Sequence, residues 1–119
     1  MNVEALDLLA TSVFLVNERG HIEYANAAAE DLFGRSRKQL CGHSAATLFD
    51  NPENIQSSID RAAAGRYADV RQLASLRRAT ESVEVAVTTV GLSGQRWPAL
   101  IETREIEQRV LADRNHRLV

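Results

Sequence analysis

The first third of the chain combines short apolar runs with turn residues at close spacing. Residues 13–16, Val-Phe-Leu-Val, form an apolar run typical of a buried strand, and residues 18–20, Glu-Arg-Gly, supply a turn. After the turn, Ile22 and Tyr24 alternate with the polar residues His21 and Glu23. The pattern therefore predicts two antiparallel strands joined by a hairpin.

Two short helices are predicted directly after the hairpin. The side-chain oxygen of Asn26 can accept a hydrogen bond from an unpaired backbone N–H of a helix that begins at Ala27. Gly34 suits the left-handed residue that ends such a helix. Ser36 and Gln39 have the spacing of a capping box, which predicts one further helical turn.

This order of hairpin and capped helix resembles the opening of a PAS domain. The resemblance is carried by residues 24–29, Tyr-Ala-Asn-Ala-Ala-Ala, and by residues 40–42, Leu-Cys-Gly, and it covers most of residues 4–110. Within the family, the chain is most similar to the N-terminal sensory domain of nitrogen-regulation histidine kinases of the NtrB type, because residues 8–16 read Leu-Leu-X-X-Ser-Val-X-Leu-Val. The positions that correspond to the fold motif of the family are Tyr24, Asn26, Asp31 and Gly42.

The resemblance implies a sensory domain that forms homodimers and signals through an exit helix to a kinase domain in the same chain. The intact kinase would autophosphorylate, phosphorylate a response regulator and answer to a PII-type protein. None of that chemistry resides in these residues, so this part of the protein is not expected to be an enzyme. Asn26 and Asp31 are expected to pin a helix to a strand through hydrogen bonds from side chain to backbone.

The longest helix is predicted over residues 51–64. Residues 51–53, Asn-Pro-Glu, combine a cap, a proline suited to the first helical position and an acid near the positive end of the helix. Apolar side chains recur on one face of this segment, at Ile55, Ile59, Ala62 and Ala63. That face is expected to lie on a sheet.

Three more strands are predicted in the second half. Residues 70–78 are assigned as a strand because the PAS fold requires one there, whereas Val83, Val85 and Val87 alternate with less apolar residues as in a half-buried strand. A turn at residues 93–95 leads to the last strand, 97–103, in which Pro98 indicates an edge position, a bulge or the start. The predicted fold class is α+β, a PAS fold with a five-stranded antiparallel sheet and helices on one face.

A helix is predicted at each end of the domain. Asn2 can cap a helix that runs through Ala10 and carries an apolar stripe at Leu6, Leu9 and Ala10. Residues 104–119 are expected to form a charged linker helix that leaves a PAS domain of residues 1–103. Neither helix can cover its apolar face alone, which favours pairing with a second copy, although the first helix could equally pack on its own sheet.

Composition excludes several classes of protein. The 119 residues fit one domain, and 14 basic against 16 acidic residues give no charge excess of the kind that nucleic-acid binding needs. No apolar run has the length of about 18 residues that a membrane span requires. Because Cys41 is the single cysteine, no intrachain disulfide can form, and a cytoplasmic location is expected.

Candidate chemistry is sparse. No catalytic or metal-binding motif is present, and no cofactor is expected, because Cys41 lacks the surroundings of a flavin-adduct cysteine and the long predicted helix lacks a haem-ligating histidine. His21 and His43 are expected at the surface, and His116 lacks the acidic neighbour of a phosphoacceptor histidine. The alternatives are a sensor that carries flavin, haem or a redox group, and an enzyme or stand-alone binder of small molecules.

One set of apolar residues has two interpretations. Side chains between sheet and long helix could line a cavity for a small apolar ligand, or they could simply fill the core, which is the commoner case. These residues are Ile55, Ile59, Val83, Val85 and Val87.

Overall fold

The computed structural model describes residues 3–65, 69–92 and 95–106, and in these residues five strands form one antiparallel sheet. The strands are β1 (Ser12–Val16), β2 (Ile22–Ala25), β3 (Asp69–Arg78), β4 (Glu81–Gly91) and β5 (Ala99–Glu105). Their order across the sheet is β2-β1-β5-β4-β3, so β1 and β5 lie side by side near its middle. The predicted α+β fold is confirmed, including the strand over residues 70–78.

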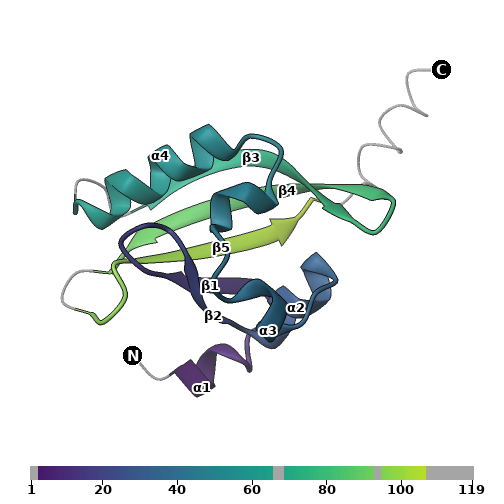
Figure 1. Cartoon of the computed structure of the whole chain (residues 1–119), viewed down its shortest axis with the longest axis horizontal. Helices are drawn as coiled ribbons and strands as arrows, with labels where there is room; N and C mark the ends of the chain where they lie inside the picture. Colours follow the sequence, from purple (N-terminus) through teal and green to yellow (C-terminus); the bar gives the residue numbers. More distant parts are fainter. Residues whose placement is uncertain (1–2, 66–68, 93–94, 107–119) are drawn as a thin grey trace.

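Helices cover one face of this sheet (Figure 1). They are α2 (Ala27–Phe33), α3 (Arg37–Leu40), a 3-10 turn (Ala45–Leu48) and α4 (Pro52–Ala63). The first helix, α1 (Val3–Leu6), lies apart from them beside β2. None of the helices in the described parts of the chain combines the length and the apolar run needed to cross a bilayer.

The core lies between the sheet and the helices. Three aromatic rings meet there: the ring centroids of Phe14 and Phe33 are 5.0 Å apart, and those of Phe33 and Phe49 are 5.8 Å apart in an edge-on arrangement. Ile55 and Ile59 place the apolar face of α4 on the sheet and are fully buried. The amphipathic pattern of this helix was therefore interpreted correctly.

Local capping explains where α2 and α3 begin and end. Asn26 caps α2 by accepting a hydrogen bond from the backbone N–H of Ala29, and Gly34 ends the helix in the left-handed region, at a φ of 65°. Ser36 and Gln39 form the predicted capping box at the start of α3.

The first helix is shorter than predicted. Its α-helical part ends at Leu6, and three-residue turns follow, in which Asp7 donates to the carbonyl of Glu4 and Leu8 to that of Ala5. The carbonyl of Leu6 accepts the N–H of Leu9 in the same series of turns and, in addition, Nδ2 of Asn26. This long-range hydrogen bond competes with helix continuation, and Asn2, the predicted cap, lies outside the described residues.

Two further helix boundaries differ from the prediction. The Asn51 side chain does not cap α4; the carbonyl oxygen of Asn51 accepts the N–H groups of Asn54 and Ile55 instead. Residues 104 and 105 do not begin a helix, because they extend β5 by pairing with β4 and Ile106 donates to the carbonyl of Glu84. The remainder of the predicted exit helix, from residue 107, lies outside the described residues.

Candidate signalling surface

Asn26 joins three elements that are distant along the chain. Its Oδ1 accepts the backbone N–H groups of Val13 at 2.9 Å and Ala29 at 3.0 Å. Its Nδ2 donates to the carbonyls of Leu6 at 2.8 Å and Thr11 at 2.9 Å. All four hydrogen-bonding positions of the amide are thus used, and the side chain is fully buried. The N-terminal segment, β1 and α2 are therefore held by one residue.

A second connection to the N-terminal segment runs through Asp7. One carboxylate oxygen of Asp7 accepts the backbone N–H of Ala27 at 3.0 Å and Nη2 of Arg37 at 2.9 Å. The same arginine donates Nε to the carbonyl of Ala25 at 2.8 Å and lies over the Tyr24 ring, 4.9 Å from its centroid. This group of side chains, the Asp7 cluster, fastens the end of α1 to the start of α2.

Contacts within the Asp7 cluster shift the pKa values of Asp7 and Tyr24. The Tyr24 hydroxyl lowers the pKa of Asp7 most, although its geometry falls short of a regular hydrogen bond. Burial raises this pKa, whereas the Ala27 N–H and Arg37 lower it further. Burial first, and the neighbouring Asp7 second, raise the pKa of Tyr24 to about 12. At neutral pH the carboxyl is therefore charged and the phenol neutral.

Replacing Tyr24 with phenylalanine is expected to raise the pKa of Asp7 toward its ordinary value of 3.8. The folded pKa of Asp7 lies below that of the unfolded chain, so its contribution to stability is present above pH 3.8 and is lost as the pH falls through the folded pKa. A carbon-13 NMR titration of the side-chain carboxyls measures the change directly. Asp31, which is exposed, is the internal control; an unaltered Asp7 titration in Tyr24→Phe would contradict the assigned role of the phenol.

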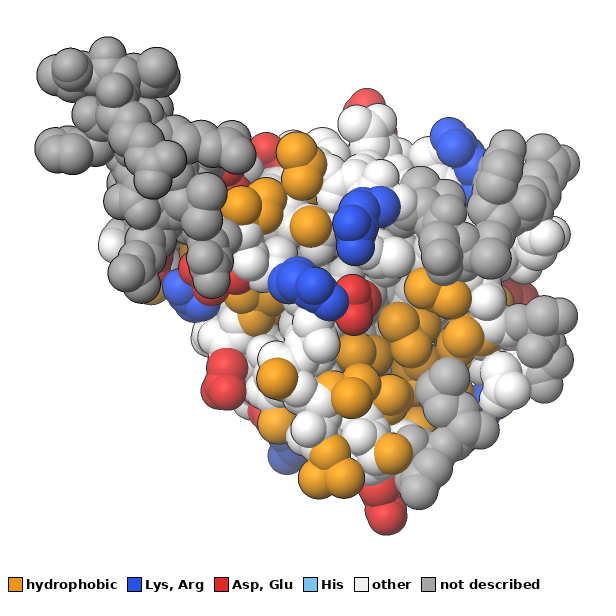
Figure 2. Space-filling model, turned by 180° about the vertical axis from the view of Figure 1, so that it is seen from behind, with side chains coloured by type: hydrophobic (Ala, Val, Ile, Leu, Met, Phe, Trp, Pro, Cys, Tyr) orange, Lys and Arg blue, Asp and Glu red, His pale blue; other side chains and the backbone are white. Residues whose placement is uncertain are grey.

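Hydrophobic side chains gather on the side of the molecule opposite α2–α4, with basic and acidic side chains beside them (Figure 2). Strand alternation places six aliphatic residues on this face of the sheet, which we call the outer face. In addition, Leu8 is 87% exposed and Leu9 46%, and Leu73 on the outer face is 69% exposed. The aliphatic residues of the outer face are Val13, Leu15, Leu73, Ala86, Val90 and Leu100, of which Val13 and Leu15 are buried.

The predicted pairing residues differ in exposure. Leu6 is half-buried, whereas Leu9 and Ala10 are exposed. Leu8 was missed by the sequence analysis, because the predicted helical stripe assumed that the helix continues to Ala10. Because the helix ends at Leu6, Leu8 and Leu9 do not follow the predicted helical stripe. No local signal in the sequence marks the end of the helix.

The five residues considered as a pocket lining are all packed in the core. Each is at most 2% exposed and belongs to the same cluster of buried side chains. They pack together between α4 and β4. These residues are Ile55, Ile59, Val83, Val85 and Val87.

The other polar candidates take no part in a common site. Cys41 is half-buried against the core, and burial raises the pKa of its thiol, which disfavours the reactive thiolate. His21 lies at the start of β2, His43 is exposed, and His116 falls outside the described residues. In the described part of the chain, no three ligating side chains are grouped so as to hold a metal ion.

Asp31 does not have its expected role. Its side chain is exposed and makes no hydrogen bond to the backbone of a strand. Of these two residues, only Asn26 forms side-chain hydrogen bonds that connect helix and strand, because it sits at the helix cap beside β1. Gly42 adopts a φ of 92°, a conformation that favours glycine.

Comparison with known proteins gives consistent results for the fold. Among solved structures, a PAS domain from Colwellia psychrerythraea is 20% identical, with a TM-score of 0.73 over 87% of this chain and 92% of that one. The PAS domain of nitrogen regulation protein NR(II) from Vibrio parahaemolyticus is 22% identical, with a TM-score of 0.67 over 87% and 95%. The photoactive yellow protein domain of the sensor histidine kinase Ppr from Rhodospirillum centenum is 18% identical, with a TM-score of 0.70 over 87% and 93%.

The comparison with curated proteins finds no match. The family model described as PAS fold, however, matches residues 1–114, which is nearly the whole chain. Five antiparallel strands in the order β2-β1-β5-β4-β3, with helices on one face, agree with this assignment. The chain therefore belongs to the PAS family.

Proposed function

We propose that this domain works as a homodimer, pairing through the N-terminal segment and the outer face of the sheet, and relays its state through the end of β5. PAS domains are sensory domains of signalling proteins and are not themselves catalytic. The observation that carries the proposal is the exposure of Leu8, Leu9 and Leu73. Full burial of a leucine contributes about 1.5–3 kcal/mol, so covering these side chains with a second copy is favourable.

Symmetry supports a second copy as the partner. In a two-fold dimer the same patch is used on both chains, so each exposed leucine is buried twice. The outer face also carries Arg104 and Glu102, whose side chains are 3.7 Å apart and leave polar groups at the rim of the apolar surface. An apolar centre with a charged rim is the usual composition of a protein interface.

Replacing Leu8 with glutamate is expected to weaken the dimer by at least about tenfold, because each copy loses a buried leucine and gains a charge at the contact. Sedimentation velocity over a range of concentrations measures the dissociation constant. Asn54→Glu is the matched control, because Asn54 is exposed on α4, on the helix-covered side of the sheet. If the unmodified chain stays monomeric at high concentration, the pairing proposal is wrong.

The relay follows contacts from the N-terminal segment to the exit of the domain. Asn26 connects the carbonyl of Leu6 with the N–H of Val13, and Val13 pairs with Glu102 on β5. A change in how two copies pack would act on this chain of hydrogen bonds and shift the end of β5. Such a relay requires that a signal stabilises the two arrangements unequally.

For the parent protein we propose a cytoplasmic nitrogen-regulation histidine kinase, with a downstream kinase domain, a response regulator and a PII-type protein as partners. The support is the sequence Leu-Leu-X-X-Ser-Val-X-Leu-Val at residues 8–16, together with the likeness to the NR(II) PAS domain. Phosphotransfer from the intact protein to a response regulator, modulated by a PII-type protein, tests this. Absence of a phosphorylatable histidine downstream would refute it.

The competing function is a sensor that carries flavin or haem. A visible absorption spectrum separates the two, because both cofactors are coloured and the pairing proposal predicts no absorption band. In the structure the space between α4 and β4 is filled by the side chains of the core, Val85 and Ile59 among them.

A further inference from the structure

Strand β3 is the last strand in the order of the sheet and lies at its edge (Figure 1). The carbonyl of Ser75 is bonded on the side away from β4, because it accepts the N–H of Asp50 at 2.9 Å. In an antiparallel ladder the backbone groups of successive residues point alternately to the two sides of the strand. The N–H and C=O groups of Leu73 and Arg71 therefore also point away from β4.

The chain itself adds a short extended segment to one end of this edge. Phe49 and Leu76 form an antiparallel bridge there. Next to the bridge, the N–H of Ser75 donates to a carboxylate oxygen of Asp50 at 2.9 Å, at the place where a backbone carbonyl would accept in a regular ladder. The edge of β3 therefore accepts an antiparallel chain, and one of its N–H groups is already bound to an acidic side chain.

The remainder of the edge, residues 69–73, is not covered by this segment, and we call it the open edge. After Asp50 the chain turns into α4, and no hydrogen bond within the described residues reaches the outward backbone groups of Leu73 and Arg71. The side chain of Leu73 is 69% exposed, and that of Arg71 is exposed as well. Unpaired N–H and C=O groups beside exposed side chains can pair with a further extended chain.

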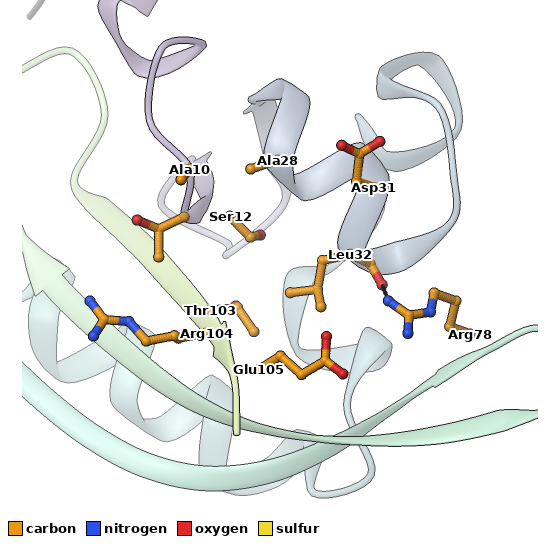
Figure 3. A pocket seen from close by; sticks show the side chains of 10 residues that line it. Ala10, Ser12, Ala28, Asp31, Leu32, Arg78, Thr103, Arg104 and Glu105 are labelled. Atoms are coloured by element: carbon orange, nitrogen blue, oxygen red, sulfur yellow. Dashed lines mark hydrogen bonds between the residues drawn. The ribbon is translucent and has the colours of Figure 1, made fainter. Parts of the chain in front are cut away.

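The charge at the open edge comes from Arg71. Among the described residues it has no acidic side chain within 4 Å, and its neighbour across β4 is the uncharged Thr88. Arg78, at the other end of β3, is occupied in contrast: it donates to the carbonyl of Leu32 at 3.3 Å (Figure 3) and lies 3.5 Å from Glu81. Opposite charges on neighbouring strands stabilise a sheet, so Arg71 favours an acidic residue beside it.

The same arginine disfavours a second copy of the chain at this place. Two antiparallel β3 strands that pair over residues 69–73 are related by a two-fold axis at Arg71. The two arginine side chains would then lie directly opposite each other, and like charges in that position destabilise the pair. The occupant that fits the open edge is therefore a different chain that carries an acid.

We propose that the open edge binds an extended acidic segment of a partner protein as a sixth, antiparallel strand. An apolar residue of the segment lies opposite Leu73, and an acidic residue two positions later lies opposite Arg71. Both exchange backbone hydrogen bonds with β3, whereas the N–H of the residue between them points away. The proposal does not rest on homodimer formation, because the added strand lies beside β3 and not on the outer face.

The test is an amide NMR titration of the chain with the capped peptide acetyl-Val-Thr-Glu-Thr-Thr-amide. We expect saturable shifts at the amides of Leu73 and Arg71. Methylation of the Val nitrogen, which bonds to β3, should weaken binding at least about tenfold, because it removes a hydrogen bond and adds a clash. Methylation of the first Thr nitrogen, which points away, is the matched control and should have a much smaller effect.

Arg71→Glu should weaken binding of this peptide roughly three- to tenfold, because an attraction at the surface becomes a repulsion. It should at the same time favour the peptide in which Lys replaces Glu. Lys38→Glu makes the same change of charge on α3, which contacts β2 at the opposite edge of the sheet, and should leave binding unchanged. The Leu8→Glu chain, in which pairing is weakened, should bind the peptide as the unmodified chain does.

Three results would overturn the inference. If no peptide shifts the amides of Leu73 and Arg71, the arginine only guards the edge against aggregation. If the Glu and Lys peptides, or the two methylated peptides, bind equally well, binding does not use the acid or the added strand. If the same amides shift with chain concentration in the absence of peptide, a second copy covers the edge.

Discussion

Replacing Asn26 with alanine is expected to lower the free energy of unfolding by about 3–5 kcal/mol. The substitution removes a helix cap, which costs about 1 kcal/mol, and leaves buried backbone groups of two segments without partners, each at a cost of about 1–3 kcal/mol. The groups left without a partner are the N–H of Val13 and the carbonyl of Thr11, whereas the carbonyl of Leu6 keeps the N–H of Leu9. Urea denaturation followed by circular dichroism measures the loss.

A matched pair of variants separates the functions of this amide. Asn26→Asp keeps the acceptor for Val13 and Ala29 but cannot donate to Leu6 and Thr11. It should therefore retain α2 and release the N-terminal segment, which hydrogen exchange at residues 6–11 reports. Asn54→Ala, at an exposed position of α4, should change stability by less than about 0.5 kcal/mol. An Asn26→Ala variant as stable as Asn54→Ala would show that the connection is unimportant.

Asn26 also shows how far the sequence could predict this structure. Its capping role was predictable, because the Asn and the helix that it caps are adjacent and the cap uses local geometry. Its hydrogen bonds to the carbonyls of Leu6 and Thr11 could not be predicted, because these partners belong to a preceding segment whose position depends on the tertiary fold. The bond to Leu6 lies at the end of α1, two residues before the exposed Leu8.

Periodicity predicted the sheet better than it predicted the ends of its strands. Val83, Val85 and Val87 alternate in the sequence and lie on the core side of β4, as expected. The last strand was expected to end at Thr103, where charged residues begin. It continues to Glu105 because its neighbour β4 is long enough to pair with Arg104 and Glu105, and pairing between strands is not visible in the residues of one strand.

A surface hollow of about 280 Å³, which Ser12 and Thr103 border, could not be found from the sequence. The two residues are far apart along the chain and become neighbours only because β1 and β5 pair. A serine or threonine in a strand gives no sign of whether its hydroxyl will be bound. Asp31 was selected for its position in the PAS motif, and the structure places it at the rim of this hollow and not against a strand.

Substitutions at Ile59 and Val85 should decide whether the space between α4 and β4 is a packed core or a ligand cavity. Both side chains are fully buried in the core cluster. In a packed core, Ile59→Ala leaves a void and lowers the free energy of unfolding by about 2–5 kcal/mol. Chemical denaturation at a concentration where the chain is monomeric measures this, with Leu73→Ala, on the exposed outer face, expected within about 0.5 kcal/mol.

Val85→Leu tests the same space in the opposite direction. Adding a methylene group to a filled core forces neighbouring side chains out of their preferred conformations, so we expect a loss of about 1–3 kcal/mol. An empty cavity would accept the larger side chain at no cost, or with a gain from the additional buried apolar surface. A neutral or stabilising Val85→Leu, together with a small effect of Ile59→Ala, would therefore contradict the packed core and favour a ligand between sheet and helix.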